Sequence, residues 1–182
     1  MHKNMVTMIA AMLFTVSTAN AAVYKFTFES FDAELTAAGQ ITVNTAGEVT
    51  GASGVISGLT DQTIGAVAAN PGFPGSAYSP DGSFIYNNQF HLSGMPFDLY
   101  GLLFVTAQNP GGFWNLWGNS PGNYSLWESA GAFNYPIQQS GTLTVAAAPE
   151  LSTWAMLTVG FAGLGLAGAR RRRAPRLAPS LD

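Results

Sequence analysis

The chain has 182 residues, of which 47% are hydrophobic and 9% charged, and its formal net charge at pH 7 is −3. It contains no cysteine, which excludes disulfide bonds, thiol catalysis and metal sites built on thiolates. Residues 22–148 hold eight acidic residues and one basic residue, Lys25, a net charge of −7. Because a single cation cannot neutralise a row of phosphates, the composition argues against nucleic-acid binding.

The first 21 residues have the three parts of a secretory signal peptide. Lys3 supplies the positive n-region, residues 5–16 form the apolar h-region, and residues 19–21 (Ala-Asn-Ala) form a small-residue cleavage site. We therefore expect cleavage between Ala21 and Ala22, and export of the chain. The alternative is an uncleaved membrane anchor, for which the apolar run is short.

From residue 24 onward the pattern changes to the two-residue alternation of half-buried strands. The expected strands are residues 24–29, 39–43, 48–50, 54–59, 64–67, 83–86, 90–92, 97–105, 113–117, 124–127 and 141–145. Residues 44–47 contain a glycine and predict a hairpin between the second and third strands. Gly51 to Gly54 reads as a turn, and residues 70–82, rich in proline and glycine, read as a long irregular loop.

Short strands separated by frequent turns are typical of antiparallel all-β folds. With no stretch that sustains a helical period, we expect one all-β domain over residues 22–148. Its architecture is expected to be an antiparallel β-sandwich or a partly open barrel.

The C-terminal region has the pattern of a membrane anchor. Residues 151–169 are nineteen consecutive uncharged residues, followed directly by Arg170, Arg171, Arg172 and Arg173. A helix of this length reaches roughly 28 Å, close to the thickness of the hydrocarbon core of a bilayer. The arginines predict that residues 174–182 are a cytoplasmic tail, with residues 22–148 on the other side of the membrane. A buried helix of a soluble domain is the alternative, but such a helix is rarely apolar on every face.

This tail resembles the PEP-CTERM sorting signal of Gram-negative bacteria, also catalogued as a C-terminal domain of ice-binding proteins. The likeness consists of Pro149-Glu150, the apolar run and the arginine cluster, so that the sorting signal spans residues 149–173. Leu151 stands where the family usually has a second proline. The resemblance implies insertion into the inner membrane, processing near Pro149 and Glu150 by an exosortase-type protease, and delivery to the cell surface or extracellular matrix. It also implies an association with exopolysaccharide or biofilm.

Candidate catalytic and metal-binding residues are sparse. His91 is the only histidine of the expected mature chain, and its neighbours Phe90 and Leu92 predict that it faces solvent. Glu29, Asp32 and Glu34 are expected to form a solvated rim, and Asp81-Gly82 is too small a group to bind calcium. Glu128 beside Trp127 is the best candidate acid for a glycoside hydrolase, which needs a second carboxyl group nearby. We expect no enzymatic activity, no metal and no cofactor.

The densest constellation is a group of aromatic residues between positions 113 and 127. Trp114 and Trp117 are three residues apart, so on one strand they face opposite sides. Exposed tryptophans bordered by Asn115, Asn119 and Asn123 would suit saccharide stacking, and Trp114, Trp117 and Trp127 are the candidate contacts. The alternative is that these rings fill the core.

The sequence thus predicts an exported, non-catalytic surface or matrix protein. Its expected partners are the inner membrane, an exosortase-type protease and, as a candidate, exopolysaccharide. A carbohydrate-binding module and, with less support, a glycoside hydrolase are the alternatives.

Overall fold

The computed structural model describes residues 21–130 and 134–148, together with the single residues 158 and 161. The described part contains β1 (Ala22–Ser30), β2 (Leu35–Val43), β3 (Val49–Gly58), β4 (Gln62–Val67), β5 (Ala77–Tyr78), β6 (Ile85–Tyr86), β7 (Leu102–Thr106), β8 (Trp114–Ser120), β9 (Asn123–Glu128) and β10 (Gln138–Ala147). The all-β prediction is confirmed. The signal peptide through residue 20, the Pro149-Glu150 motif, the apolar run 151–169 and the arginines 170–173 lie outside the described residues.

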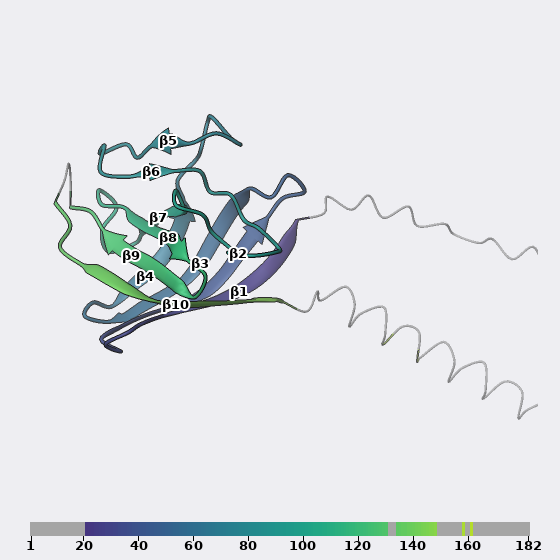
Figure 1. Ribbon diagram of the computed structural model, residues 1–182, viewed down its shortest axis with the longest axis horizontal. Helices are drawn as coiled ribbons and strands as arrows, with labels where there is room; N and C mark the ends of the chain where they lie inside the picture. The colour runs from purple at the N-terminus through teal and green to yellow at the C-terminus, as the bar shows by residue number, and fades with distance from the viewer. Residues whose placement is uncertain (1–20, 131–133, 149–157, 159–160, 162–182) are drawn as a thin grey trace, which may run out of the picture.

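Eight strands form a closed antiparallel barrel in the order β1-β10-β9-β8-β7-β4-β3-β2 (Figure 1). Closure comes from the pairing of β1 with β10, which runs from Tyr24 opposite Ala147 to Ser30 opposite Gly141. The domain is antiparallel as predicted, but it is a closed barrel rather than a sandwich or a partly open barrel. Sandwich and barrel strands show the same alternation of polar and apolar residues, so the pattern alone does not reveal that the last strand returns to the first.

The alternation predicted for the strands decides which side chains fill the barrel. In β1, Phe26 and Phe28 are buried, whereas Lys25, Thr27 and Glu29 are exposed. The interior is packed with side chains from all eight barrel strands, as expected for a barrel of this size.

The predicted hairpin at residues 44–47 is confirmed, since it joins β2 to β3. The turn expected at Gly51 to Gly54 is not found, because these residues lie within β3 and residues 54–58 continue the same strand. Gly39 and Gly54 are opposite one another across β2 and β3, and a Cβ atom on Gly39 would lie 2.1 Å from the carbonyl oxygen of Ser53. These glycines allow close approach of two strands rather than a turn.

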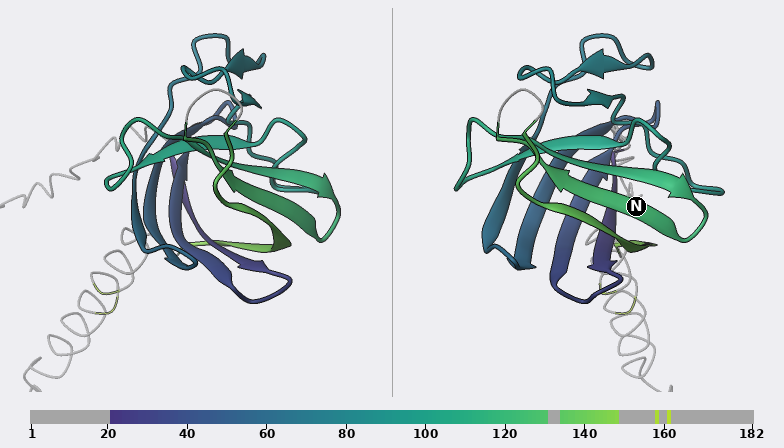
Figure 2. Two further views of the ribbon diagram at one scale, coloured as in Figure 1. Left: turned by 90° about the vertical axis from the view of Figure 1, so that its left-hand side faces the viewer. Right: turned by 60° about the vertical axis from the view of Figure 1, so that its left-hand side comes forward.

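The connection from β4 to β7 leaves the barrel and carries the short β5–β6 hairpin. Within the expected loop 70–82 only Ala77 and Tyr78 are in a strand. We call residues 77–86 the flap; its Phe84 and Tyr86 pack against Leu103 of β7 in a second, smaller core. The flap thereby covers part of the outer wall near β7 and β8 (Figures 1 and 2).

Three expected strands of this connection are shorter or absent. Of residues 83–86 only Ile85 and Tyr86 are in a strand. Residues 90–92 are not in a strand; the chain begins a loop here, in which the His91 backbone N–H donates to the Pro96 carbonyl at 3.0 Å. The apolar stretch 97–105 is in a strand only from Leu102. Asp98 accepts hydrogen bonds from the backbone N–H groups of Tyr100 and Gly101, and Gly101 has φ +73°. Because of this turn, β7 begins only at Leu102.

The two ends of the barrel domain lie side by side. β1 begins at Ala22 and β10 ends at Ala147, and the Ala148 backbone N–H donates to the Val23 carbonyl at 2.8 Å. The chain therefore enters and leaves the barrel at the same end. In the part of the chain that the structure describes, no helix has the length and apolar character needed to cross a membrane.

Candidate functional site

The tryptophans of β8 and β9 are divided between the inside and the outside of the wall. Trp114 is completely buried in the barrel core, where its indole N–H donates to the Gln62 side-chain oxygen at 3.2 Å. It cannot contact a ligand at the surface, so its assignment as a saccharide contact was wrong. Trp117 and Trp127 are partly exposed, and the prediction that Trp114 and Trp117 face opposite sides is confirmed.

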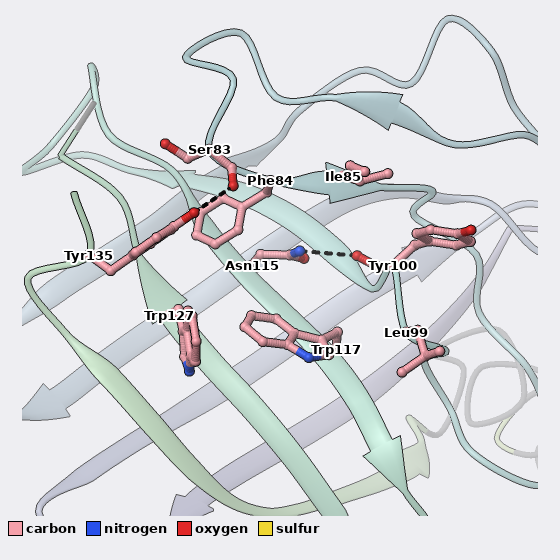
Figure 3. Close-up of a pocket in the computed structure, with 9 residues that line it drawn as sticks. All are labelled: Ser83, Phe84, Ile85, Leu99, Tyr100, Asn115, Trp117, Trp127 and Tyr135. Atoms are coloured by element: carbon pink, nitrogen blue, oxygen red, sulfur yellow. Dashed lines mark hydrogen bonds between the residues drawn. The ribbon is translucent and has the colours of Figure 1, made fainter. Parts of the chain in front are cut away.

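Trp117 and Trp127 form the wall of a pocket of about 320 Å³ on the outside of the barrel (Figure 3). β8 and β9 supply three of its side chains, the flap supplies three, and the remainder come from the loops before β7 and before β10. The lining residues are Ser83, Phe84, Ile85, Leu99, Tyr100, Asn115, Trp117, Trp127 and Tyr135.

The aromatic rings of the pocket hold one another in a fixed arrangement. The centroids of Trp117 and Trp127 are 5.0 Å apart with an interplanar angle of 72°, and those of Trp127 and Tyr135 are 5.4 Å apart at 62°. Such edge-to-face pairs are favourable beyond the area they bury. The Tyr135 hydroxyl donates to the Ser83 carbonyl at 2.8 Å, which ties the loop before β10 to the flap.

Asn115 lies on the outer face of β8, among these rings (Figure 3). Its Nδ2 donates to the Tyr100 carbonyl at 3.0 Å, and the residue is 2% exposed. Its Oδ1 is a buried polar atom without a hydrogen-bond partner among the described residues. A buried carbonyl oxygen without a hydrogen bond destabilises the protein, and a ligand that donates a hydrogen bond to it would regain that free energy.

The other two asparagines named from the sequence lie beside Trp117. The Trp117 indole N–H donates to Asn119 Oδ1 at 3.0 Å, and Asn119 Nδ2 donates to Asn123 Oδ1 at 3.2 Å and to Ser125 Oγ at 2.9 Å. Asn119 and Asn123 therefore orient the indole ring of Trp117, and only Asn115 lines the pocket.

The pocket is electrically neutral, because no described residue that lines it is acidic or basic. Two carboxylates accept hydrogen bonds from the backbone of residues that line it: Asp98 from the Tyr100 N–H at 2.9 Å, and Asp81 of the flap from the Ser83 N–H at 3.1 Å. Burial raises the pKa of Asp81, but hydrogen bonds from Ser129, Ser79 and Ser83 outweigh this effect and hold the pKa below its ordinary value of 3.8. Asp81 accepts a hydrogen bond from the Ser129 hydroxyl, and thus joins the flap to the chain just after β9.

Glu128, the candidate catalytic acid, does not belong to this pocket. Alternation along β9 places it on the face opposite Trp127, where it is buried at 6% exposure. Its Oε1 accepts from Gln62 Nε2 at 2.9 Å and from Asn109 Nδ2 at 3.1 Å. Neighbours in sequence thus lie on opposite sides of the wall, and the proposed pairing of acid and aromatic ring does not form.

The remaining acidic residues and the histidine have local roles. Glu29, Asp32 and Glu34 are exposed as expected. The hydrogen bonds from the Ser30 hydroxyl and the Glu34 backbone N–H hold the pKa of Asp32 below its ordinary value. His91 is partly exposed, but Leu92 is 81% exposed, so the expected alternation around His91 fails in this loop. The described residues contain no group of three or more His, Asp or Glu side chains placed to hold a metal ion.

Most of the pocket was not predicted from the sequence. Phe84, Tyr100 and Tyr135 are distant in sequence from β8 and β9, and they meet Trp117 and Trp127 only through the folded flap and loops. Their aromatic character was the one available signal, and it does not indicate which of them share a site.

Comparison of the chain with protein-family models, with curated proteins and with solved structures finds no match.

Proposed function

We propose that the chain is an exported, non-catalytic protein of the cell surface or extracellular matrix, and that its barrel binds saccharide through the outer-wall pocket. The observation that carries this proposal is the set of partly exposed rings of Trp117, Trp127 and Tyr135 around a neutral pocket. Aromatic rings pack against the apolar faces of sugar rings, and nearby amide and hydroxyl groups provide the hydrogen bonds.

The sequence signals at the two ends support export and membrane sorting. The barrel begins at Ala22 and ends at Ala147, and therefore fits between the expected signal-peptide cleavage site and the Pro149-Glu150 motif. An anchor at residues 151–169 would hold the barrel by the end at which β1 begins and β10 ends. The outer wall, with its pocket, would then remain accessible. Cleavage by an exosortase-type protease would release the domain to the surface or to an exopolysaccharide matrix.

A glycoside hydrolase has less support than a binding module. Hydrolysis needs two carboxyl groups that flank the scissile bond. None of the described residues that line the pocket is Asp or Glu, and Glu128 faces the barrel interior.

Binding is tested by pull-down of the exported protein on the exopolysaccharide of the producing cell. Trp117→Ala and Trp127→Ala should each weaken retention by about tenfold or more, because each removes one wall of the pocket. Phe31→Ala is the matched control, since Phe31 is 64% exposed and does not line the pocket. If both tryptophan variants fold and bind like the wild type, the pocket is not the saccharide site.

Sorting is tested by intact-mass analysis of the exported protein from cells with and without the protease. The expected product begins at Ala22 and ends near Pro149, and it is seen only when the protease is present. A product that keeps Arg170 to Arg173 in both strains would contradict release.

A further inference from the structure

The pocket contains a hydrogen-bond acceptor whose orientation is fixed. Asn115 Nδ2 donates to the Tyr100 carbonyl at 3.0 Å. A rotation of the amide by 180° would set two carbonyl-type oxygens against each other, so the assignment of oxygen and nitrogen is determined by this bond. Asn115 Oδ1 is thus an acceptor, and it is the buried side-chain polar atom without a partner in the described part of the chain.

The surroundings of this acceptor define the group that would satisfy it. Asn115 lies between the Phe84 ring of the flap and the Trp117 ring of β8 (Figure 3). A fitting group must present an N–H or O–H donor with an apolar part directly beside it. A secondary acetamide has this combination, because its N–H is next to a methyl-bearing carbonyl group. A ring hydroxyl of a sugar also supplies a donor, but the carbon that bears it offers a single C–H to the rings rather than a methyl group.

The absence of charged side chains from the described lining favours a neutral ligand. No described side chain in the lining is a cation that would hold a uronate, and none is a carboxylate that would hold a free amine. Residues 22–148 carry a net charge of −7, which repels polyanionic polymers in addition.

We propose that the pocket binds the acetamido group of a neutral N-acetylated amino sugar. The amide N–H donates to Asn115 Oδ1, and the methyl group packs against Phe84 and Trp117. Because Asn115 is 2% exposed, admission of the group requires pocket side chains to move outward. This inference rests on the proposed function, which assigns saccharide binding to the same pocket.

The test compares two tetrasaccharides by isothermal titration calorimetry with the full-length protein. The β-1,4-linked tetramer of N-acetylglucosamine and that of glucose differ only in the acetamido groups that replace the 2-hydroxyl groups. We expect the acetylated tetramer to bind at least about tenfold more tightly, the effect of one well-formed buried hydrogen bond together with methyl burial. The β-1,4-linked tetramer of glucosamine, which lacks the acetyl groups, should bind no better than the glucose tetramer at roughly 1 M salt, which screens the attraction of its ammonium groups to the acidic barrel.

Asn115→Leu removes the acceptor and should reduce the preference to less than about threefold while binding of the glucose tetramer persists. If this variant does not fold, the comparison of ligands on the wild-type protein decides alone. Equal affinity for the N-acetylglucosamine and glucose tetramers would overturn the inference and leave saccharide binding in place. Failure of all three tetramers to bind would overturn the inference, whereas the proposed function is decided separately by the exopolysaccharide pull-down.

Discussion

Gln62, the first residue of β4, is expected to be among the most sensitive positions in the barrel. Its Oε1 accepts hydrogen bonds from the Thr106 hydroxyl and, at 3.2 Å, from the Trp114 indole N–H. Its Nε2 donates to Glu128 Oε1 at 2.9 Å. Trp114, Thr106 and Glu128 are buried at 0%, 2% and 6% exposure, respectively. This one side chain therefore links β4 to β7, β8 and β9 inside the wall.

Replacement of Gln62 by alanine leaves the Trp114 N–H and the Thr106 hydroxyl without an acceptor. A buried polar group that loses its partner costs about 1–3 kcal/mol, so two such groups cost about 2–6 kcal/mol. Small domains are stable by about 5–15 kcal/mol, and the loss is therefore a large fraction of the total. With a urea m-value of about 1.5 kcal/mol/M, the unfolding midpoint should fall by roughly 1–4 M.

The assay is equilibrium urea unfolding followed by circular dichroism, with Gln40→Ala as the matched control. Gln40 is an exposed glutamine on β2, so its replacement should change stability by less than about 0.5 kcal/mol. Trp114→Phe, alone and combined with Gln62→Ala, isolates the indole hydrogen bond, and the double variant should cost less than the sum of the single variants. If Gln62→Ala unfolds at the same urea concentration as Gln40→Ala, the network does not stabilise the barrel and the reasoning fails.

Two further predictions concern the close approach of β2 to β3 and the attachment of the flap. Gly39→Ala should lower the free energy of unfolding by about 1–3 kcal/mol, because its Cβ would lie 2.1 Å from the Ser53 carbonyl oxygen. Gly51→Ala on β3, where the nearest contact is 3.6 Å, should change it by less than about 0.5 kcal/mol in the same urea assay, and equal losses would refute the steric argument. The lowered pKa of Asp81 means that its contribution to stability is present above about pH 4 and is lost as the pH falls through the folded-state pKa. Asp81→Asn and Ser129→Ala should therefore each reduce the loss of stability between pH 4 and pH 2 in urea titrations, and an unchanged pH profile in both would contradict the role given to this hydrogen bond.

The sequence alone was sufficient for the fold class and for the local direction of many side chains. Alternation in residues 24–29 predicted which faces of β1 are buried, and the spacing of Trp114 and Trp117 predicted that they face opposite sides. Both follow from the two-residue period of a strand, which is a local property of the backbone. The hairpin at residues 44–47 was predicted for the same reason, since its turn chemistry lies within a few residues.

Tertiary structure decided whether the barrel closes, which tryptophan lies inside, and how the pocket is assembled. Closure depends on the pairing of β1 with β10, whose residues are more than a hundred positions apart. The pocket depends on the flap and on Tyr135, which reach Trp117 and Trp127 only after the wall has formed. In β8 both faces carry a tryptophan, so alternation shows that the two faces differ but not which of them is turned inward. That choice is made when the apolar side chains of all eight strands are buried together, which a reading of one segment at a time cannot supply.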